Sequence, residues 1–123
     1  MLGNLFTYTI HLHGTLAANA TGNIKLPVAA SLISVAACGS NANNGLLDVG
    51  TSADRDGILS AVDIGDSNTP TEYDRADWDG ALATAGDPYH FDKGSILAWD
   101  LDYDGASGTA AANVTLTLTF LEG

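Results

Sequence analysis

The chain has 123 residues, 46% of them hydrophobic, and its 15 Asp and Glu against 4 Lys and Arg give a formal net charge of −11. This length predicts one domain, residues 1–123, with a core of its own. The negative charge repels phosphate groups and so argues against nucleic acid and anionic membrane surfaces as partners. The first residues lack the pattern of a secretory signal, and folding in the cytoplasm is expected.

Alternation of apolar and polar residues predicts a strand near each end of the chain, at residues 5–13 and 113–121. Successive side chains of a strand point to opposite faces, so each segment has one buried face. The expected inward residues are Phe6, Tyr8, Ile10 and Leu12 in the first segment and Val114, Leu116, Leu118 and Phe120 in the last.

Shorter strands are predicted between these two, separated by loops rich in Gly, Asn and Asp. They cover residues 23–28, 31–38, 46–52, 57–65 and 95–103. Residues 66–92 lack regular alternation and allow one short helical turn at most. Seven or eight strands at this spacing predict an all-β fold, an antiparallel two-sheet sandwich of jelly-roll or immunoglobulin-like kind with little or no helix.

Three alternating carboxylates, Asp100, Asp102 and Asp104, followed by Gly105, match the opening of a calcium loop and are the candidate metal ligands. The twelfth position holds Ala111 where the loop needs a bidentate Glu, and no helix flanks it. The alternative is that Asp100 and Asp102 form the solvent face of a strand, and the incomplete motif favours it. No cofactor is predicted.

Two further patterns have a chemical and a plain interpretation. The sequence Gly-Asp-Ser-Asn around Ser67, with a later His90, resembles fragments of the serine hydrolases named for their GDS motif, but that family is α/β, and Ser67 fits a turn. His11 and His13 share a strand face at a metal-binding spacing, yet no third ligand is identifiable and a solvent-facing or interface pair is favoured. The single cysteine, Cys38, is expected to be a buried, unreactive thiol. No catalytic residue is predicted.

Three apolar residues are candidates for an interface. Leu2 and Leu5 come before or at the start of the first strand, where they are expected to be exposed. Trp78 stands in a charged cluster, which is a common setting for an interface hot spot. The alternative for Trp78 is a core residue that plugs one end of the sandwich. The charged neighbours are Asp74, Arg75, Asp77 and Asp79.

Three stretches, VGTSADRDGIL, AVDIGDSNTPTEYDRADWDGAL and LDYDGASGTAAANVTLTLTFLEG, resemble small acidic β-sandwich virion proteins of tailed bacteriophages, the head decoration or cement proteins. The stretch FTYTIHLHGTLAANATGNIKLPVAASLISVAAC is similar in style, so the resemblance covers most of the chain. It implies a non-enzymatic subunit, often trimeric, that binds the outside of an assembled capsid and bridges neighbouring major capsid proteins.

The sequence therefore leads us to expect a capsid decoration protein that stabilises the head and has the major capsid protein as its partner. We expect it to form a homo-oligomer, with a trimer favoured. Its place would be the exterior of the virion, after assembly in the bacterial cytoplasm. Two alternatives stay open: a tail or head-fibre component, and a carbohydrate-binding module. A sugar platform would use aromatic residues of the irregular segment, namely Tyr73, Trp78, Tyr89 and Phe91.

Overall fold

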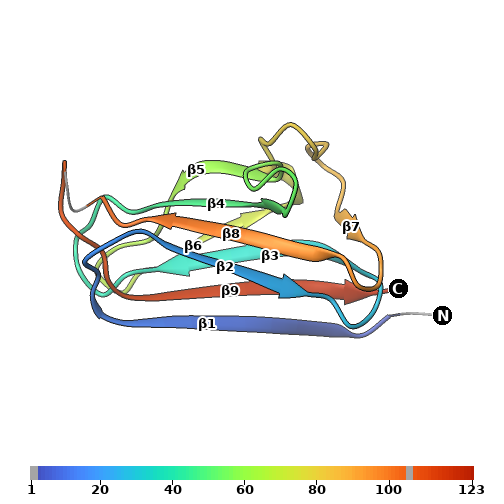
Figure 1. The fold of residues 1–123 in the computed structure, drawn as a ribbon, viewed down its shortest axis with the longest axis horizontal. Helices are drawn as coiled ribbons and strands as arrows, with labels where there is room; N and C mark the ends of the chain where they lie inside the picture. Colours follow the sequence, from blue (N-terminus) through green and yellow to red (C-terminus); the bar gives the residue numbers. More distant parts are fainter. Residues whose placement is uncertain (1–2, 105–106) are drawn as a thin grey trace.

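Two antiparallel β-sheets pack face to face in the computed structural model, which describes residues 3–104 and 107–123 (Figure 1). One sheet has the order β1 (Leu5–Thr15), β9 (Ala112–Glu122), β3 (Ala30–Cys38) and β6 (Thr71–Asp74), and the short β7 (Tyr89–Phe91) also pairs with β3. The other sheet has the order β2 (Ala20–Lys25), β8 (Ile96–Asp102), β4 (Leu46–Thr51) and β5 (Leu59–Asp63). A 3₁₀ turn, η1 (Arg75–Asp77), follows β6.

The chain crosses between the sheets at almost every connection. From β1 to β4 successive strands alternate between the two sheets, β4 and β5 form a hairpin in one sheet, and β8 and β9 again lie in different sheets. An immunoglobulin fold pairs its first two strands within one sheet, which does not occur here. The sandwich predicted from the sequence is confirmed, and the strand order is that of a jelly roll.

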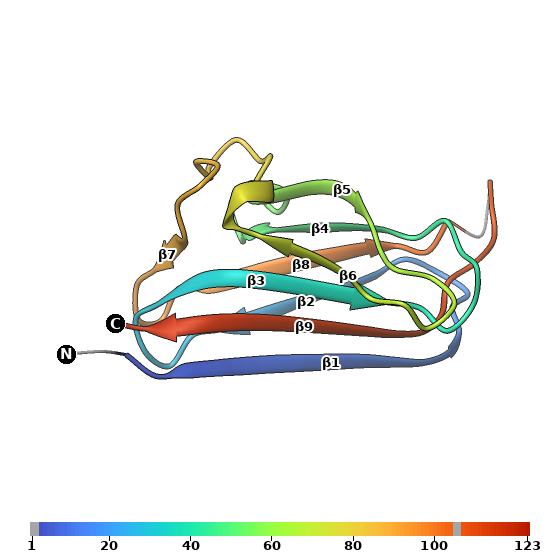
Figure 2. The ribbon, with the colours of Figure 1, turned by 180° about the vertical axis from the view of Figure 1, so that it is seen from behind.

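The described residues form nine strands, because the segment that was expected to be irregular supplies β6 and β7. Both are short, and both pair with β3 (Figure 2). The second strand also differs from its prediction, since it begins at Ala20 and ends before Pro27. Proline has no N–H to donate to a neighbouring strand, so the ladder stops there.

The core lies between the sheets and follows the predicted alternation. The four predicted inward residues of β9, from Val114 to Phe120, are at most 1% exposed, and Leu97, Trp99 and Leu101 of β8 face them and are also buried. The inward residues of β1 are only half-buried, because β1 is an edge strand with β9 on one side alone. On the outer face Thr9 pairs with Thr117 and Thr7 pairs with Thr119.

Candidate functional site

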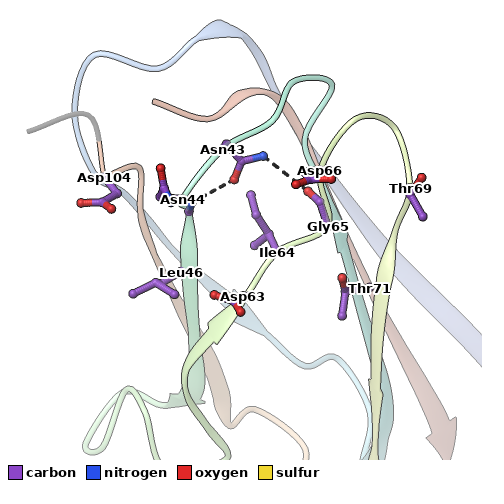
Figure 3. A pocket seen from close by; sticks show the side chains of 11 residues that line it. Asn43, Asn44, Leu46, Asp63, Ile64, Gly65, Asp66, Thr69, Thr71 and Asp104 are labelled. Carbon is purple, nitrogen blue, oxygen red and sulfur yellow. Dashed lines mark hydrogen bonds between the residues drawn. The ribbon is translucent and has the colours of Figure 1, made fainter. Parts of the chain in front are cut away.

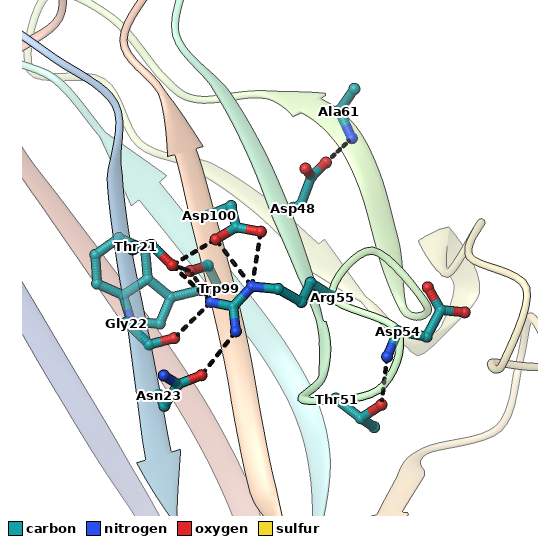
Figure 4. Close-up of polar contacts among 10 residues, drawn as sticks. All are labelled: Thr21, Gly22, Asn23, Asp48, Thr51, Asp54, Arg55, Ala61, Trp99 and Asp100. Carbon is teal, nitrogen blue, oxygen red and sulfur yellow. Dashed lines mark hydrogen bonds and ion pairs between the residues drawn. The ribbon is translucent and has the colours of Figure 1, made fainter.

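Arg55, in the loop between β4 and β5, reaches across the outer face of the second sheet (Figure 4). Its Nε donates to both carboxylate oxygens of Asp100, at 3.1 and 2.9 Å. Its Nη1 donates to Asn23 Oδ1 at 2.8 Å, and its Nη2 donates to Thr21 Oγ1 and to two backbone carbonyls. The guanidinium fork thus joins β2 to β8 and fixes the loop against the sheet.

Asp100 is therefore already occupied by protein donors. Besides Arg55, Thr21 Oγ1 donates to its Oδ1 at 2.5 Å. The hydrogen bonds from Arg55 hold the pKa of Asp100 below its usual range, against a smaller opposing effect of burial. A carboxylate neutralised in this way is a poor ligand for a cation, because the metal would have to displace Arg55.

The other two candidate aspartates serve the turn that follows β8. Asp102 Oδ1 accepts from the backbone N–H of Asp104 at 3.0 Å, and Asp104 accepts from the hydroxyl of Ser107. Asp104 adopts a left-handed conformation with φ of 52°, which short polar residues tolerate in turns. Within residues 3–104 and 107–123, no three His, Cys, Asp or Glu side chains are grouped as a metal site.

Asp48 of β4 lies beside the Arg55–Asp100 pair, and its electrostatic environment is opposite to that of Asp100. Its carboxylate accepts from the backbone N–H of Ala61 at 2.6 Å, at the irregular step in the pairing of β4 and β5. Burial raises the pKa of Asp48, and the negative charges of Asp56, Asp100 and Asp102 raise it further. Asp48 thus fixes the backbone of β5, but its ionised form is disfavoured at this position.

A hollow opens where the loops after β3 and β5 meet, at one end of the sandwich (Figure 3). Asn43 ties these loops together, because its Oδ1 accepts from Gly45 N at 2.9 Å and its Nδ2 donates to Gly65 O at 3.5 Å. Asp63 at the end of β5, Asp66 in the loop that follows β5 and Asp104 in the loop that follows β8 line the hollow. The amide groups of the lining fix the conformation of the loops, and the lining as a whole points to no particular ligand.

Trp78 lies in the core, with 4% of its surface exposed, and its indole Nε1–H donates to Asp87 O at 2.9 Å. Its charged neighbours have structural tasks: Asp74 and Asp77 cap η1, and Asp79 accepts from Ser60 N at 2.9 Å. This placement supports the core alternative for Trp78, since a partner would find little of the ring to contact.

The remaining sequence candidates are scattered. His11 and His13 are exposed on β1, with ring centroids 6.4 Å apart, and His11 is bonded to Thr115 Oγ1. His90 lies near Ser31, at the opposite end of β3 from the turn that holds Ser67, about 23 Å away along the strand. The hydrolase pairing is therefore wrong.

Cys38 is half-buried and not fully buried as expected, since it lies at the last position of β3. Its thiol donates to Gly39 O at 3.4 Å. Burial, together with the charge of Asp66, raises the pKa of the thiol and so disfavours the thiolate, the nucleophilic form.

One large surface carries no acidic residue at all. Every one of the 15 Asp and Glu residues lies at or after Asp48, and residues 112–121 also lack charge. Because β1, β9 and β3 are neighbours, their outward side chains together form a surface that is rich in Thr, Ser, Ala, His, Asn and Leu, called here the acid-free face. Its exposed residues on β1 and β9 are Leu5, Thr7, Thr9, His11, His13, Thr15, Asn113 and Leu121.

Leu5 is the most exposed large apolar residue of the described chain, at 65%, and it pairs in register with Leu121, at 40%. Both belong to the acid-free face. Leu2 lies outside the described residues. The uneven distribution of charge was not predicted, although the lack of any acidic residue before Asp48 is visible in the sequence.

No helix in the part of the chain that the structure describes is long and apolar enough to cross a membrane. No protein-family model matches the chain, and no curated protein matches it either. Among solved structures, the chain is similar to one in the structure described as "Cyanophage Pam1 capsid asymmetric unit", with a TM-score of 0.59 and 19% sequence identity. The similarity covers 99% of this chain and 87% of that one, so the two proteins share the whole fold.

Proposed function

We propose that this chain is a non-enzymatic structural protein of a bacteriophage virion, a decoration or cement protein that binds the outside of the head and stabilises it. The observation that carries the proposal is the full-length similarity of its jelly roll to a chain of a cyanophage capsid structure. The resemblance of its sequence to small acidic virion proteins supports the same role.

The charge distribution fits a protein that has one bound side and one solvated side. The acid-free face offers apolar and hydroxyl side chains without the cost of burying carboxylates, as the centre of a protein interface requires. The outer face of the other sheet carries Asp48, Asp100 and Asp102. In this proposal the acid-free face contacts major capsid proteins and further copies of the chain, arranged as a trimer, and the acidic side faces solvent.

The test is addition of the purified chain to expanded capsids that lack it. Binding should saturate at a fixed ratio to the major capsid protein and raise the temperature of capsid disruption, because a ligand of the assembled state stabilises that state. Absence of saturable binding contradicts a decoration role. Capsid-free tails and fibres, offered in parallel, distinguish the tail or head-fibre alternative.

Leu5 allows a matched pair of variants in the same assay. Leu5→Ser removes an exposed apolar side chain from the acid-free face and should weaken capsid binding without lowering the melting temperature. Leu82→Ser removes a side chain that is 45% exposed in the loop between η1 and β7, outside the acid-free face, and should leave binding unchanged. Equal binding by both variants would move the contact away from Leu5.

The carbohydrate-binding alternative receives no support from the aromatic residues that suggested it. Trp78 and Phe91 are buried, at 4% and 2% exposure, and the hydroxyl of Tyr73 is engaged by Asp63 O. Only Tyr89 among the four keeps a half-exposed ring without such a bond in the described structure, and it packs edge-on against Phe91. One ring of this kind does not make a stacking platform.

A further inference from the structure

The two edges of the sandwich are built differently. At the β5–β6 edge, the Tyr73 hydroxyl donates to Asp63 O at 2.6 Å and links the two sheets. Beside it, Gly39 N donates to Gly65 O at 2.7 Å and Gly65 N to Ala37 O at 3.0 Å, so the backbone itself bridges the gap. This edge is closed by the protein's own hydrogen bonds.

The β1–β2 edge leaves apolar side chains in partial contact with solvent. Phe6, Tyr8, Ile10 and Leu12 of β1 point inward yet remain half-buried, as does Ile24 of β2. The equivalent inward residues of the neighbouring β9 are at most 1% exposed. The core is thus complete at β9 and incomplete at β1, where no further strand covers it (Figure 1).

The backbone of β1 adds a second feature to this edge. β1 has 11 residues and pairs with β9 alone, so the N–H and C=O groups of its other side have no strand partner among the described residues. Proteins usually protect such edges with Pro, Lys, bulges or short length. From Leu5 to Leu12 the pairing register is unbroken and the sequence contains no Pro, Lys, Arg, Asp or Glu.

Charge decides which partner fits this edge. Two chains that each carry −11 repel one another, and the repulsion is weakest when they meet through surfaces without acidic residues. The β1–β2 edge and the acid-free face beside it form such a surface, since Lys25 is the only Lys, Arg, Asp or Glu residue before Asp48. A second copy brings the same surface without acidic residues, with the same unpaired strand and the same half-buried apolar residues.

We infer that the β1–β2 edge is the contact surface between copies of this chain, which meet there with Phe6, Tyr8, Ile10 and Leu12 covered by their partners. The inference rests on the homo-oligomer of the proposed function and names the surface that builds it. Contact at this edge completes the core of each copy and leaves the acidic side of every copy in solvent.

The experiment measures molar mass in solution without any capsid, by light scattering during size exclusion. The wild-type chain should give a multiple of 12.6 kDa at about 100 µM, where a complex with a dissociation constant of about 1 µM is nearly complete. A double substitution, Thr7→Glu with Thr9→Glu, places two carboxylates on exposed positions of β1 and should give the single-chain mass. Thr69→Glu with Thr109→Glu adds the same charge at exposed loop positions and should leave the oligomer intact.

Tyr8→Lys is a second variant, which puts at the edge the type of residue that blocks strand pairing in natural sheets. Circular dichroism checks that each variant is folded. Amide hydrogen exchange of the wild-type chain needs no variant: the amides of β1 should lose protection on dilution, while those of β3 keep theirs.

A single-chain mass for the wild type, or an oligomer that survives the Thr7→Glu, Thr9→Glu change, overturns the inference. Capsid binding is measured separately, so a wild-type chain that binds capsids as a monomer overturns this contact surface and leaves the decoration role standing. An oligomer that does not bind capsids overturns the decoration role and leaves this contact surface standing.

Discussion

Arg55 and Asp100, 45 residues apart in the sequence, form a two-point contact in which Nε lies 3.1 and 2.9 Å from the carboxylate oxygens. The contact holds the β4–β5 loop against β8, and through Asn23 and Thr21 it extends to β2. One arginine therefore braces three segments of the second sheet, and an aspartate of the suspected calcium motif is its main partner.

Asp100→Asn should destabilise the protein at pH 7, by about 1 kcal/mol or less, since the side chains of the pair are about one-third exposed. The pKa of Asp100 is lowered in the folded protein, so its contribution is complete above the unfolded pKa of about 4 and is lost as the pH falls through the folded value. Urea unfolding at pH 7 and pH 3 measures this. An equal loss at both pH values contradicts the role of the charge.

Asp48→Asn should have the opposite effect. The raised pKa of Asp48 means that its ionised form weakens the fold, so the penalty is present at pH 7 and disappears below the unfolded pKa. Asparagine keeps an oxygen for the N–H of Ala61, and a gain of up to about 1 kcal/mol at pH 7 is expected. The two substitutions remove the same charge from adjacent strands, so each is the control for the other. Destabilisation by Asp48→Asn at pH 7 would count against this account.

Gly22→Ala should destabilise the protein through one specific collision. Gly22 pairs with Trp99 across β2 and β8, and a Cβ at Gly22 would lie 2.5 Å from the indole. Overpacking of this kind costs about 1–3 kcal/mol. The same change in a Trp99→Leu background should cost less, because the ring atoms nearest the new Cβ, Nε1, Cε2 and Cζ2, are then absent, and a double-mutant cycle in urea measures the difference. Additive effects would show that the ring is not the obstacle.

Trp78→Ala should cost about 3–5 kcal/mol of folding stability, as expected for a large buried side chain. Trp78→Phe keeps most of the packing and loses the hydrogen bond to Asp87 O, so a smaller loss of about 1 kcal/mol is expected. Chemical denaturation of both variants tests this. An unchanged melting temperature in Trp78→Ala, combined with weaker capsid binding, would restore Trp78 as an interface residue.

Calcium should raise the melting temperature of the protein no more than a salt without divalent cations does at equal ionic strength. Asp100 is held by Arg55 and Thr21, and Asp102 caps the turn at Asp104, so the three carboxylates do not converge. Thermal melts at fixed ionic strength, with Asp102→Asn as the control, check this expectation. A calcium-specific rise of several degrees that is absent in Asp102→Asn would establish a site.

Local sequence patterns were sufficient to predict a strand and its inward residues where the strand is long and has one buried face. The alternation at residues 113–121 predicted both the strand and its inward residues, because side-chain direction in a strand depends only on position along the chain. The same pattern at residues 5–13 predicted the direction of Phe6 and Tyr8 but not their half-burial, since that depends on β1 being at the edge of its sheet.

Other features depend on contacts between distant segments. β6 and β7 are three to four residues long and exist because β3 offers them an edge, so no local signal marked them. Trp78 had two interpretations in the sequence, and its position over the core decided between burial and exposure.

The charge pattern shows most clearly which features the sequence determined and which the tertiary structure decided. The sequence by itself determined that no acidic residue precedes Asp48 and that residues 112–121 are uncharged. Only the tertiary structure placed these two stretches side by side, through the pairing of β1 with β9 from opposite ends of the chain. Strand pairing over about 100 residues is set by the shared core, so the acid-free face is a property of the sandwich and not of either segment.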